Sequence, residues 1–219
     1  MQKKISTRYI ATVAMLAAIS YIAVFVGRLV PNVAGFLSYD PKDAVVVISG
    51  FVLGPATSLL VSVIVSLAEM VTVSGTGFYG LVMNVVSTCA FALPAAFIYK
   101  KYRTKKGAVI GLAVGVAAMA AVMVAWNYVI TPLYMGVPRE TVAGMLATVF
   151  LPFNLLKGSI NAALTMLIYK PVVTALRKIG FVSPDPEGKK HRFSVVTAVV
   201  SAALIATFLL LLLALAGVI

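Results

Sequence analysis

Long runs of apolar residues divide this chain into segments of membrane-spanning length. A helix needs about 20 such residues to cross the hydrocarbon core of a bilayer. The runs that reach this length are residues 9–27, 56–73, 79–99, 107–132, 151–176 and 193–218. A shorter apolar run, residues 43–54, ends at Gly54-Pro55, where proline cannot continue a helical ladder. The pattern predicts an all-α integral membrane protein: six helices, counting the short one, and an additional C-terminal seventh.

Composition agrees with a membrane location and excludes an ordinary soluble domain. Hydrophobic residues make up 62% of the chain and charged residues 11%, and the mean hydropathy is +1.06. We therefore interpret the net charge of +12 as a topology signal and not as a nucleic-acid surface. The predicted parts are a membrane domain over residues 1–178, a basic linker over residues 179–192 and a further transmembrane helix over residues 193–219.

The basic residues predict the orientation of the helices. Most of the 18 Lys and Arg residues lie in residues 1–8, 100–106 and 170–192, which alternating helices place on one side. By the positive-inside rule that side is cytoplasmic in a multi-pass cell-membrane protein. The N-terminus is then cytoplasmic, and the C-terminus is outside if the seventh helix spans. The outer connections are residues 28–42, 74–78 and 133–150.

Polar side chains inside the apolar runs converge on one depth near the outer face. Asn154, Lys157 and Asn161 are spaced to share one face of a helix. Three other helices place polar side chains at a similar depth, namely Glu69, Asn84 and Asn127. Because such groups are costly in lipid and tend to mark substrate pathways, we expect a polar recess open to the outside. The alternatives are hydrogen bonding between helices, a Glu69–Lys157 ion pair, and a Lys157 side chain that reaches the headgroups.

The first outer connection ends in Asp40-Pro41-Lys42-Asp43, a pattern typical of a helix start. Asp40 is predicted to be the N-cap, Pro41 the first helical residue and Asp43 an acid of the first turn, without excluding a ligand contact. Amide groups in the recess and aromatic residues such as Tyr39 in the outer loops favour a planar, heteroatom-rich ligand. A single lysine without an arginine cluster disfavours a polyphosphate.

The polar residues of the spans do not suggest catalysis. They include one carboxylate, Glu69, and no histidine, whereas an active site needs a nucleophile with its base, a carboxylate pair or a metal cluster. His191 falls in the charged linker and is expected to be solvated. We therefore expect no enzyme activity, no metal site and no cofactor. The chain also carries no Walker-type phosphate-binding motif.

Four stretches give the chain a family resemblance. "YDPKDAVVVISGFVLGP", "AEMVTVSGTGFYG", "NYVITPLYMG" and "FNLLKGSINAALTMLIYKPV" resemble, in order and spacing, the riboflavin-specific substrate-binding subunit, or S component, of energy-coupling factor (ECF) transporters. The resemblance covers about residues 5–178. It implies a six-helix substrate-binding domain that captures riboflavin at the outer face, with its phosphate FMN as a further candidate ligand. The implied partners are a transmembrane coupling subunit and two ATPase subunits.

The resemblance also implies roles for single residues. Asn127, Asn154 and Lys157 match polar residues expected to hydrogen-bond the isoalloxazine ring, and the segment Leu37–Asp40 matches a loop that covers the vitamin. Ala14 and Ala18 match a small-residue surface for docking the coupling subunit. The expected ligand-binding residues are Leu37, Tyr39, Asp40, Thr76, Tyr79, Asn84, Asn127, Asn154 and Lys157. The alternatives are an S component for another vitamin or a nucleobase-like ligand, and a membrane structural protein without transport.

Overall fold

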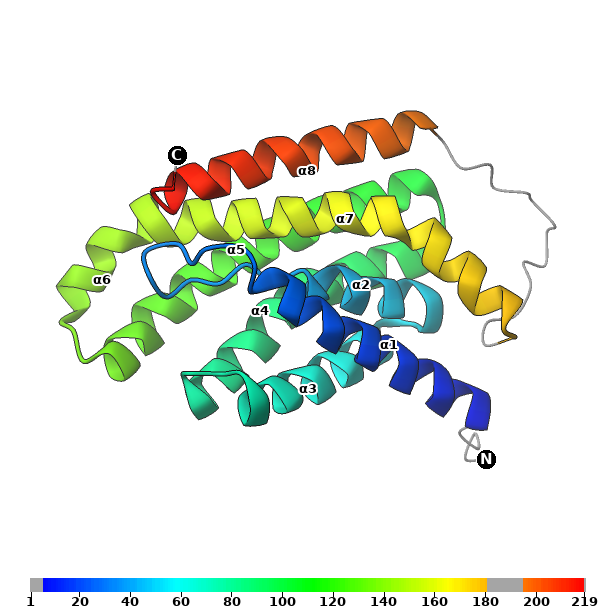
Figure 1. Cartoon of the computed structure of the whole chain (residues 1–219), viewed down its shortest axis with the longest axis horizontal. Helices are drawn as coiled ribbons and strands as arrows, with labels where there is room; N and C mark the ends of the chain where they lie inside the picture. The colour runs from blue at the N-terminus through cyan, green and yellow to red at the C-terminus, as the bar shows by residue number, and fades with distance from the viewer. Residues whose placement is uncertain (1–5, 181–194, 219) are drawn as a thin grey trace.

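The computed structural model describes residues 6–180 and 195–218, and these residues are mostly helical (Figure 1). The helices are α1 (Thr7–Gly27), α2 (Lys42–Leu53), α3 (Pro55–Thr72), α4 (Gly77–Tyr102), α5 (Lys105–Met135), α6 (Arg139–Met145), η1 (Leu146–Phe150), α7 (Leu151–Lys178) and α8 (Val195–Leu215). Within the described part of the chain, six helical stretches are long and apolar enough to cross a membrane. The predicted membrane-spanning runs and the short α2 are confirmed.

The connection predicted over residues 133–150 is largely helical, so that prediction is wrong in part. α5 extends to Met135 and stops at Gly136, which adopts the left-handed conformation that glycine tolerates best. α6 starts soon after Gly136. Glu140 lies in its first turn, where a negative charge interacts favourably with the helix dipole. α6 then continues through the π-helical turn η1 into α7. The segment is a helical extension of α7.

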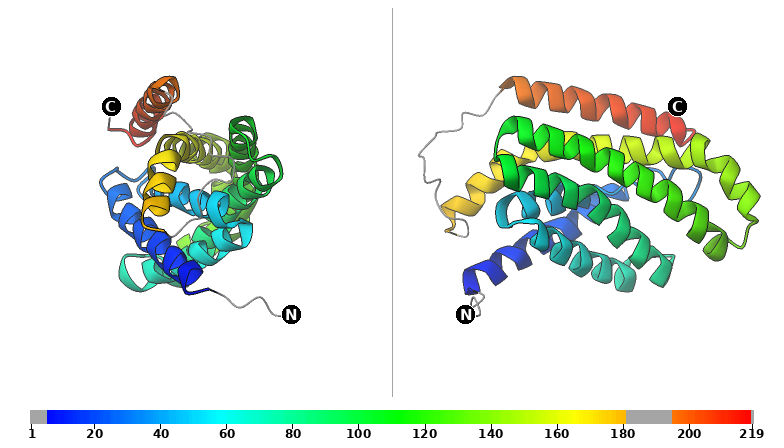
Figure 2. Two further views of the ribbon diagram at one scale, coloured as in Figure 1. Left: turned by 90° about the vertical axis from the view of Figure 1, so that its right-hand side faces the viewer. Right: turned by 180° about the vertical axis from the view of Figure 1, so that it is seen from behind.

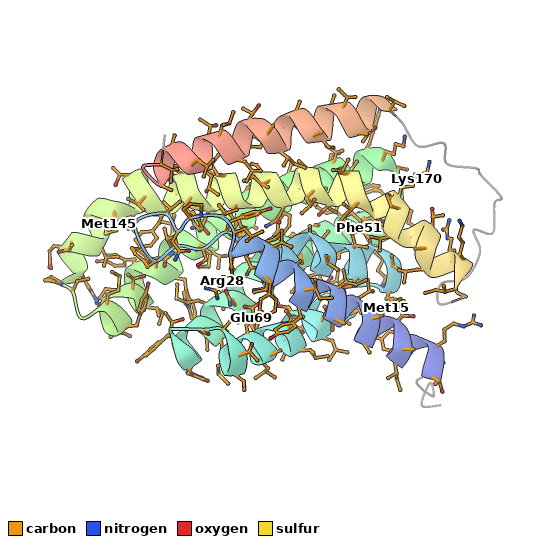
Figure 3. The ribbon with its side chains drawn as sticks, viewed as in Figure 1. Met15, Arg28, Phe51, Glu69, Met145 and Lys170 are labelled. Carbon is orange, nitrogen blue, oxygen red and sulfur yellow. The ribbon has the colours of Figure 1, made fainter. Side chains whose placement is uncertain are left out.

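The helices lie roughly along one axis, which gives the bundle two ends (Figure 3). We call one the loop end: it holds Met145 and residues 28–41, which we call the first loop. The other, the basic end, holds Lys170 and the connection between α4 and α5. The described parts of the basic segments lie at this end, as predicted, while its cytoplasmic location stays a prediction.

The core of the bundle forms where α1 to α5 pack together. Gly111 and Gly115 of α5 face α4, and a Cβ on them would lie 2.8 Å from the Ala95 carbonyl oxygen and 2.4 Å from that of Phe91. Small residues at this interface let the two backbones approach closely, as is common in membrane helices. The buried core side chains come from all five helices, for example Val13, Val46, Val61, Phe91 and Met119.

The last two long helices complete the bundle on one side. α7 packs against α5 and α2, and α8 lies antiparallel along α7 (Figure 2). The seventh helix predicted from the sequence is therefore present. Most of the predicted linker, including His191, lies outside the described residues, and the division of the chain into three parts stays a prediction.

Candidate functional site

The first loop folds back across the end of α1. Gly27, the last residue of α1, makes this possible, because a Cβ there would lie 2.5 Å from the carbonyl oxygen of Tyr39. Arg28 then donates a hydrogen bond to the carbonyl of Val73 (3.2 Å), which joins the end of α1 to that of α3. Tyr39 and Asp40 are consequently only 7% and 8% exposed and point into the bundle.

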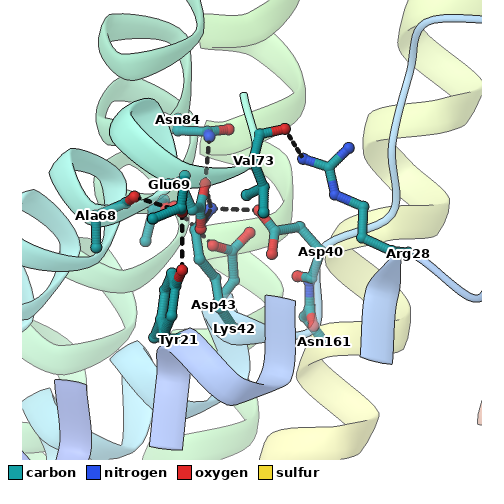
Figure 4. A network of polar contacts seen from close by, with 12 residues as sticks. Tyr21, Arg28, Asp40, Lys42, Asp43, Ala68, Glu69, Val73, Asn84 and Asn161 are labelled. Atoms are coloured by element: carbon teal, nitrogen blue, oxygen red, sulfur yellow. Dashed lines mark hydrogen bonds and ion pairs between the residues drawn. The ribbon is translucent and has the colours of Figure 1, made fainter. Parts of the chain in front are cut away.

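A cluster of charged side chains is buried beneath the first loop (Figure 4). Lys42, which is fully buried at the start of α2, forms ion pairs with Asp40 and with Glu69 of α3, whose Oε1 lies 2.7 Å from its Nζ. Asn84 of α4 donates a hydrogen bond to Glu69 Oε2 (2.6 Å). One ammonium group thus balances carboxylates from the loop and α3. Although burial opposes ionisation, Lys42 and Lys157 hold the pKa of the Asp40 carboxyl below its ordinary value.

Asp43 extends this cluster to α4 and α7. Its Oδ1 accepts a hydrogen bond from Thr88 (2.6 Å), and its Oδ2 lies 3.5 Å from Lys157 Nζ. Lys157 is only 6% exposed, so its ammonium group does not extend to the membrane surface. The Glu69–Lys157 ion pair considered from the sequence is wrong, because Glu69 pairs with Lys42 and Lys157 pairs with Asp43.

The predicted N-cap at Asp40 is also wrong, whereas Asp43 does lie in the first turn of α2 as predicted. α2 begins at Lys42, Pro41 occupies the N-cap position, and the helix start has no side-chain cap hydrogen bond. The two carboxylates instead turn toward buried ammonium groups, which would be costly to leave unpaired. The sequence pattern did not single out Lys42. Lys42 could have been found because the buried charges of Glu69 and Lys157 each need a partner of opposite charge. The charged residues beside Pro41 supply these partners: Lys42 pairs with Glu69, and Asp43 pairs with Lys157.

Asn161 connects the first loop to α7. This fully buried side chain donates through Nδ2 to the carbonyl of Asp40 (3.0 Å) and accepts from the phenol of Tyr39 at Oδ1 (3.4 Å). Burial and the nearby carboxylates of Asp43 and Asp40 raise the pKa of the Tyr39 phenol, so it stays protonated and able to donate. The closed position of the loop therefore depends on α7.

Asn127 and Asn154 are buried, with 1% and 2% exposure, whereas the sequence predicted that they face a recess open to the outside. Their hydrogen bonds stay within α5 and within the continuous helix of η1 and α7. Asn127 donates to the carbonyl of Met123 (2.7 Å) and accepts from Thr131 (3.0 Å). Asn154 donates to the carbonyl of Phe150 (2.8 Å). Amides that satisfy themselves locally can exchange these bonds for bonds to a ligand.

Three further expected ligand residues lie outside the charged cluster. Leu37 is half-buried among apolar side chains of the first loop and α7. Thr76 is exposed in the connection from α3 to α4. Tyr79 is 44% exposed, with its ring centroid 6.3 Å from that of Tyr134. Their contact with a ligand stays a prediction.

The two alanines of the predicted docking surface are exposed on α1. Ala14 and Ala18 are one turn apart on a face that the described helices leave uncovered. Their neighbours on that side, Ile10 and Ile22, are 57% and 64% exposed. α1 itself packs against α2 and α3, and α8 packs against α7, so the additional helix does not occupy this face.

Comparison with known proteins connects these features to transport. The family described as the substrate-specific component of ECF transporters matches residues 8–169. The chain is 27% identical to the riboflavin transporter RibU of Staphylococcus aureus (strain TCH60), over 77% of this chain and 92% of that protein. It is 28% identical to the riboflavin transporter FmnP of Bacillus subtilis (strain 168), over 73% of this chain and 89% of that protein. A solved S component of a bacterial ECF transporter superposes with a TM-score of 0.66 and 26% identity, over 77% of this chain and 96% of that one.

Proposed function

Because the chain belongs to the family of substrate-specific components of ECF transporters, we propose that it captures riboflavin at the loop end for ATP-driven import. Similar proteins that are named riboflavin transporters support this ligand. The observation that carries the proposal is a set of buried donors in two neighbouring helices: Lys157, which pairs with Asp43 of the charged cluster, and the amides of Asn127 and Asn154. An ammonium group and two amides suit the carbonyl and nitrogen acceptors of an isoalloxazine ring.

Riboflavin entry requires the first loop to move. Tyr39 and Asp40 are buried against Asn161, so the closed loop covers the polar cluster. Lys157 already interacts with Asp43, and the ligand must share or replace that interaction. Binding therefore includes an opening step, and the loop closes again over the vitamin, with Leu37 and Tyr39 beside it. Thr76 and Tyr79 complete the proposed contacts from the α3–α4 side.

The orientation and partners follow from the charges and from α1. The positive-inside rule places the basic end in the cytoplasm and the loop end outside, where a vitamin is captured. The N-terminus is then cytoplasmic and the end of α8 is outside. We propose that the exposed Ala14 and Ala18 dock a transmembrane coupling subunit, which works with two ATPase subunits.

A titration of the purified chain with riboflavin tests the proposal. Flavin fluorescence should be quenched to saturation at one riboflavin per chain, without ATP. Thiamine, biotin and adenine are the comparison ligands for a sister subunit of different specificity, and FMN tests tolerance of a phosphate. If another of these ligands binds saturably and riboflavin gives no response, that ligand becomes the proposed substrate in place of riboflavin. Absence of binding by any vitamin or base would favour a structural role.

A further inference from the structure

α8 has no counterpart in the matched part of the family. The family match ends at residue 169, whereas α8 covers Val195–Leu215. Only 11% of its most apolar 18-residue stretch is buried, so the other described helices leave most of its surface uncovered. Its extensive contact is with α7. An added helix with so little buried surface contributes little to the core of the bundle. Any specific role of α8 therefore depends on the one face that is buried.

The buried face of α8 is a single stripe that runs from Ser201, which is 5% exposed, to the loop end. Its residues recur every three or four positions, which places them on one side of a helix. Its apolar members in one cluster are Ile205, Phe208, Leu209, Leu212, Leu215 and Ala216. Leu212 is the best buried of them, with 1% exposure, whereas Leu210 and Leu211 beside it are 58% and 48% exposed. The helix therefore packs through one defined face.

This stripe packs into the same apolar cluster as the first loop. The cluster, which we call the loop cluster, has as its buried members Val33, Tyr39, Phe153, Ile160 and Leu212. Val33 and Tyr39 come from the first loop, Phe153 and Ile160 from α7, and Leu212 from α8. Leu37, which is expected to cover the ligand, packs against the same cluster. α8 and the first loop thus share one buried apolar unit.

The first loop is therefore held on two sides. On its polar side, Tyr39 and Asp40 bond to Asn161. On its apolar side it belongs to the loop cluster. Two backbone hydrogen bonds between Val33 and Leu37 (2.9 and 3.0 Å) close the tip of the loop, so it lifts as one piece. Lifting it would break the bonds to Asn161 and separate Val33 and Tyr39 from the loop cluster, of which Leu212 is a member.

We propose that α8 braces the first loop in its closed position, with Leu212 as a positioning residue. The brace slows opening of the loop and so slows both entry and release of the vitamin. This role rests on the proposed function only for the identity of the ligand. Opening of the loop is a property of the chain alone, and it can be measured without any ligand.

Amide hydrogen exchange of the full chain, without vitamin, tests the brace. In Leu212→Ala the amides of Val33 and Leu37 should exchange about ten-fold faster or more, because truncation of a buried leucine removes packing that holds the loop closed. The matched control is Leu211→Ala, which removes the same atoms from the exposed face and should match the unaltered chain. Equal exchange in the unaltered chain and both variants would overturn the proposal.

Two further comparisons separate bracing of the loop from general stabilisation. Leu215→Ala, at a half-buried position of the stripe, should also speed loop exchange if Leu212→Ala does not fold. In Val33→Ala, which loosens the loop side of the cluster, adding Leu212→Ala should give less than the sum of the separate effects. Faster exchange throughout the bundle, instead of in residues 28–41, would show that α8 only stabilises the fold and would contradict the brace.

The rate of vitamin release extends the test to function. Riboflavin should leave Leu212→Ala about ten-fold faster than it leaves Leu211→Ala, and association should also accelerate, so the Kd changes less than either rate. Unchanged release rates, together with faster loop exchange, would mean that opening of the loop does not limit release and would overturn that part of the proposal. If the unaltered chain binds no riboflavin, the proposed function fails, while hydrogen exchange still decides the brace.

Discussion

Replacing Lys157 by methionine separates its two proposed roles. The side chain keeps its length and apolar stem but loses the ammonium group, which in the closed structure lies 3.5 Å from Asp43 Oδ2. The proposed function gives this group a second role as a donor to riboflavin. A change in ligand affinity reports on the second role, and a change in the stability of the ligand-free chain reports on the first.

The structure sets the size of both effects. At a separation of 3.5 Å and an effective dielectric constant of about 20, attraction between Lys157 and Asp43 amounts to about 5 kcal/mol before the cost of desolvation. Leaving a buried partner charge unpaired usually costs about 3–5 kcal/mol, so Lys157→Met should lower the melting temperature clearly. An unmatched ligand acceptor costs about 1–3 kcal/mol, which corresponds to a rise in Kd of about 5- to 150-fold.

The assay compares three variants by thermal unfolding and by riboflavin titration. Asp43→Asn removes the partner charge, keeps the shape of the side chain and can still accept a hydrogen bond from Thr88. The double variant Lys157→Met/Asp43→Asn should therefore recover stability but not affinity. If the double variant recovers both, or if Lys157→Met binds riboflavin with unchanged affinity, Lys157 only balances Asp43 and its role as a ligand donor is wrong.

Other substitutions test the remaining parts of the account. Ala14→Leu or Ala18→Leu should abolish riboflavin uptake by the assembled transporter and leave binding by the isolated chain intact; loss of both would contradict docking through this face. Lys42→Met should destabilise the ligand-free chain by about 3–5 kcal/mol, with partial recovery on adding Glu69→Gln; a normal melting temperature would contradict the ion pairs. Asn161→Leu should speed amide exchange in the first loop, because the Tyr39 and Asp40 bonds are lost; unchanged exchange would show that these bonds do not hold the loop.

Apolar run length made the helices predictable from the sequence. Each long run became a helix, and the Gly54-Pro55 break separates α2 from α3 as expected. The segment over residues 133–150 was harder, because its mixed polarity resembles a loop although its residues can form a helix. Its helical state depends on continuity with α7 through η1, which periodicity does not report.

The candidate site was predictable as a set of residues but not as a set of partners. The place of Glu69, Asn127, Asn154 and Lys157 inside membrane-length helices followed from the apolar runs, but the sequence predicted a recess open to the outside and these side chains are buried. The pairing did not follow, because the local pattern around Pro41 predicts a helix cap equally well. Only the fold brings Lys42 between carboxylates of the loop and α3. Long-range ion pairs depend on which helices become neighbours, and a single sequence leaves that choice open.

Amide hydrogen exchange with and without riboflavin tests the central claim most directly, since it reports binding and its location in one experiment. Saturating riboflavin should slow exchange in residues 28–43, where the first loop leads into α2, and in residues 151–161 at the start of α7. Thiamine at the same concentration should leave both segments unchanged. Protection confined to the basic end, or no protection by riboflavin at any described segment, would contradict a riboflavin site beneath the first loop.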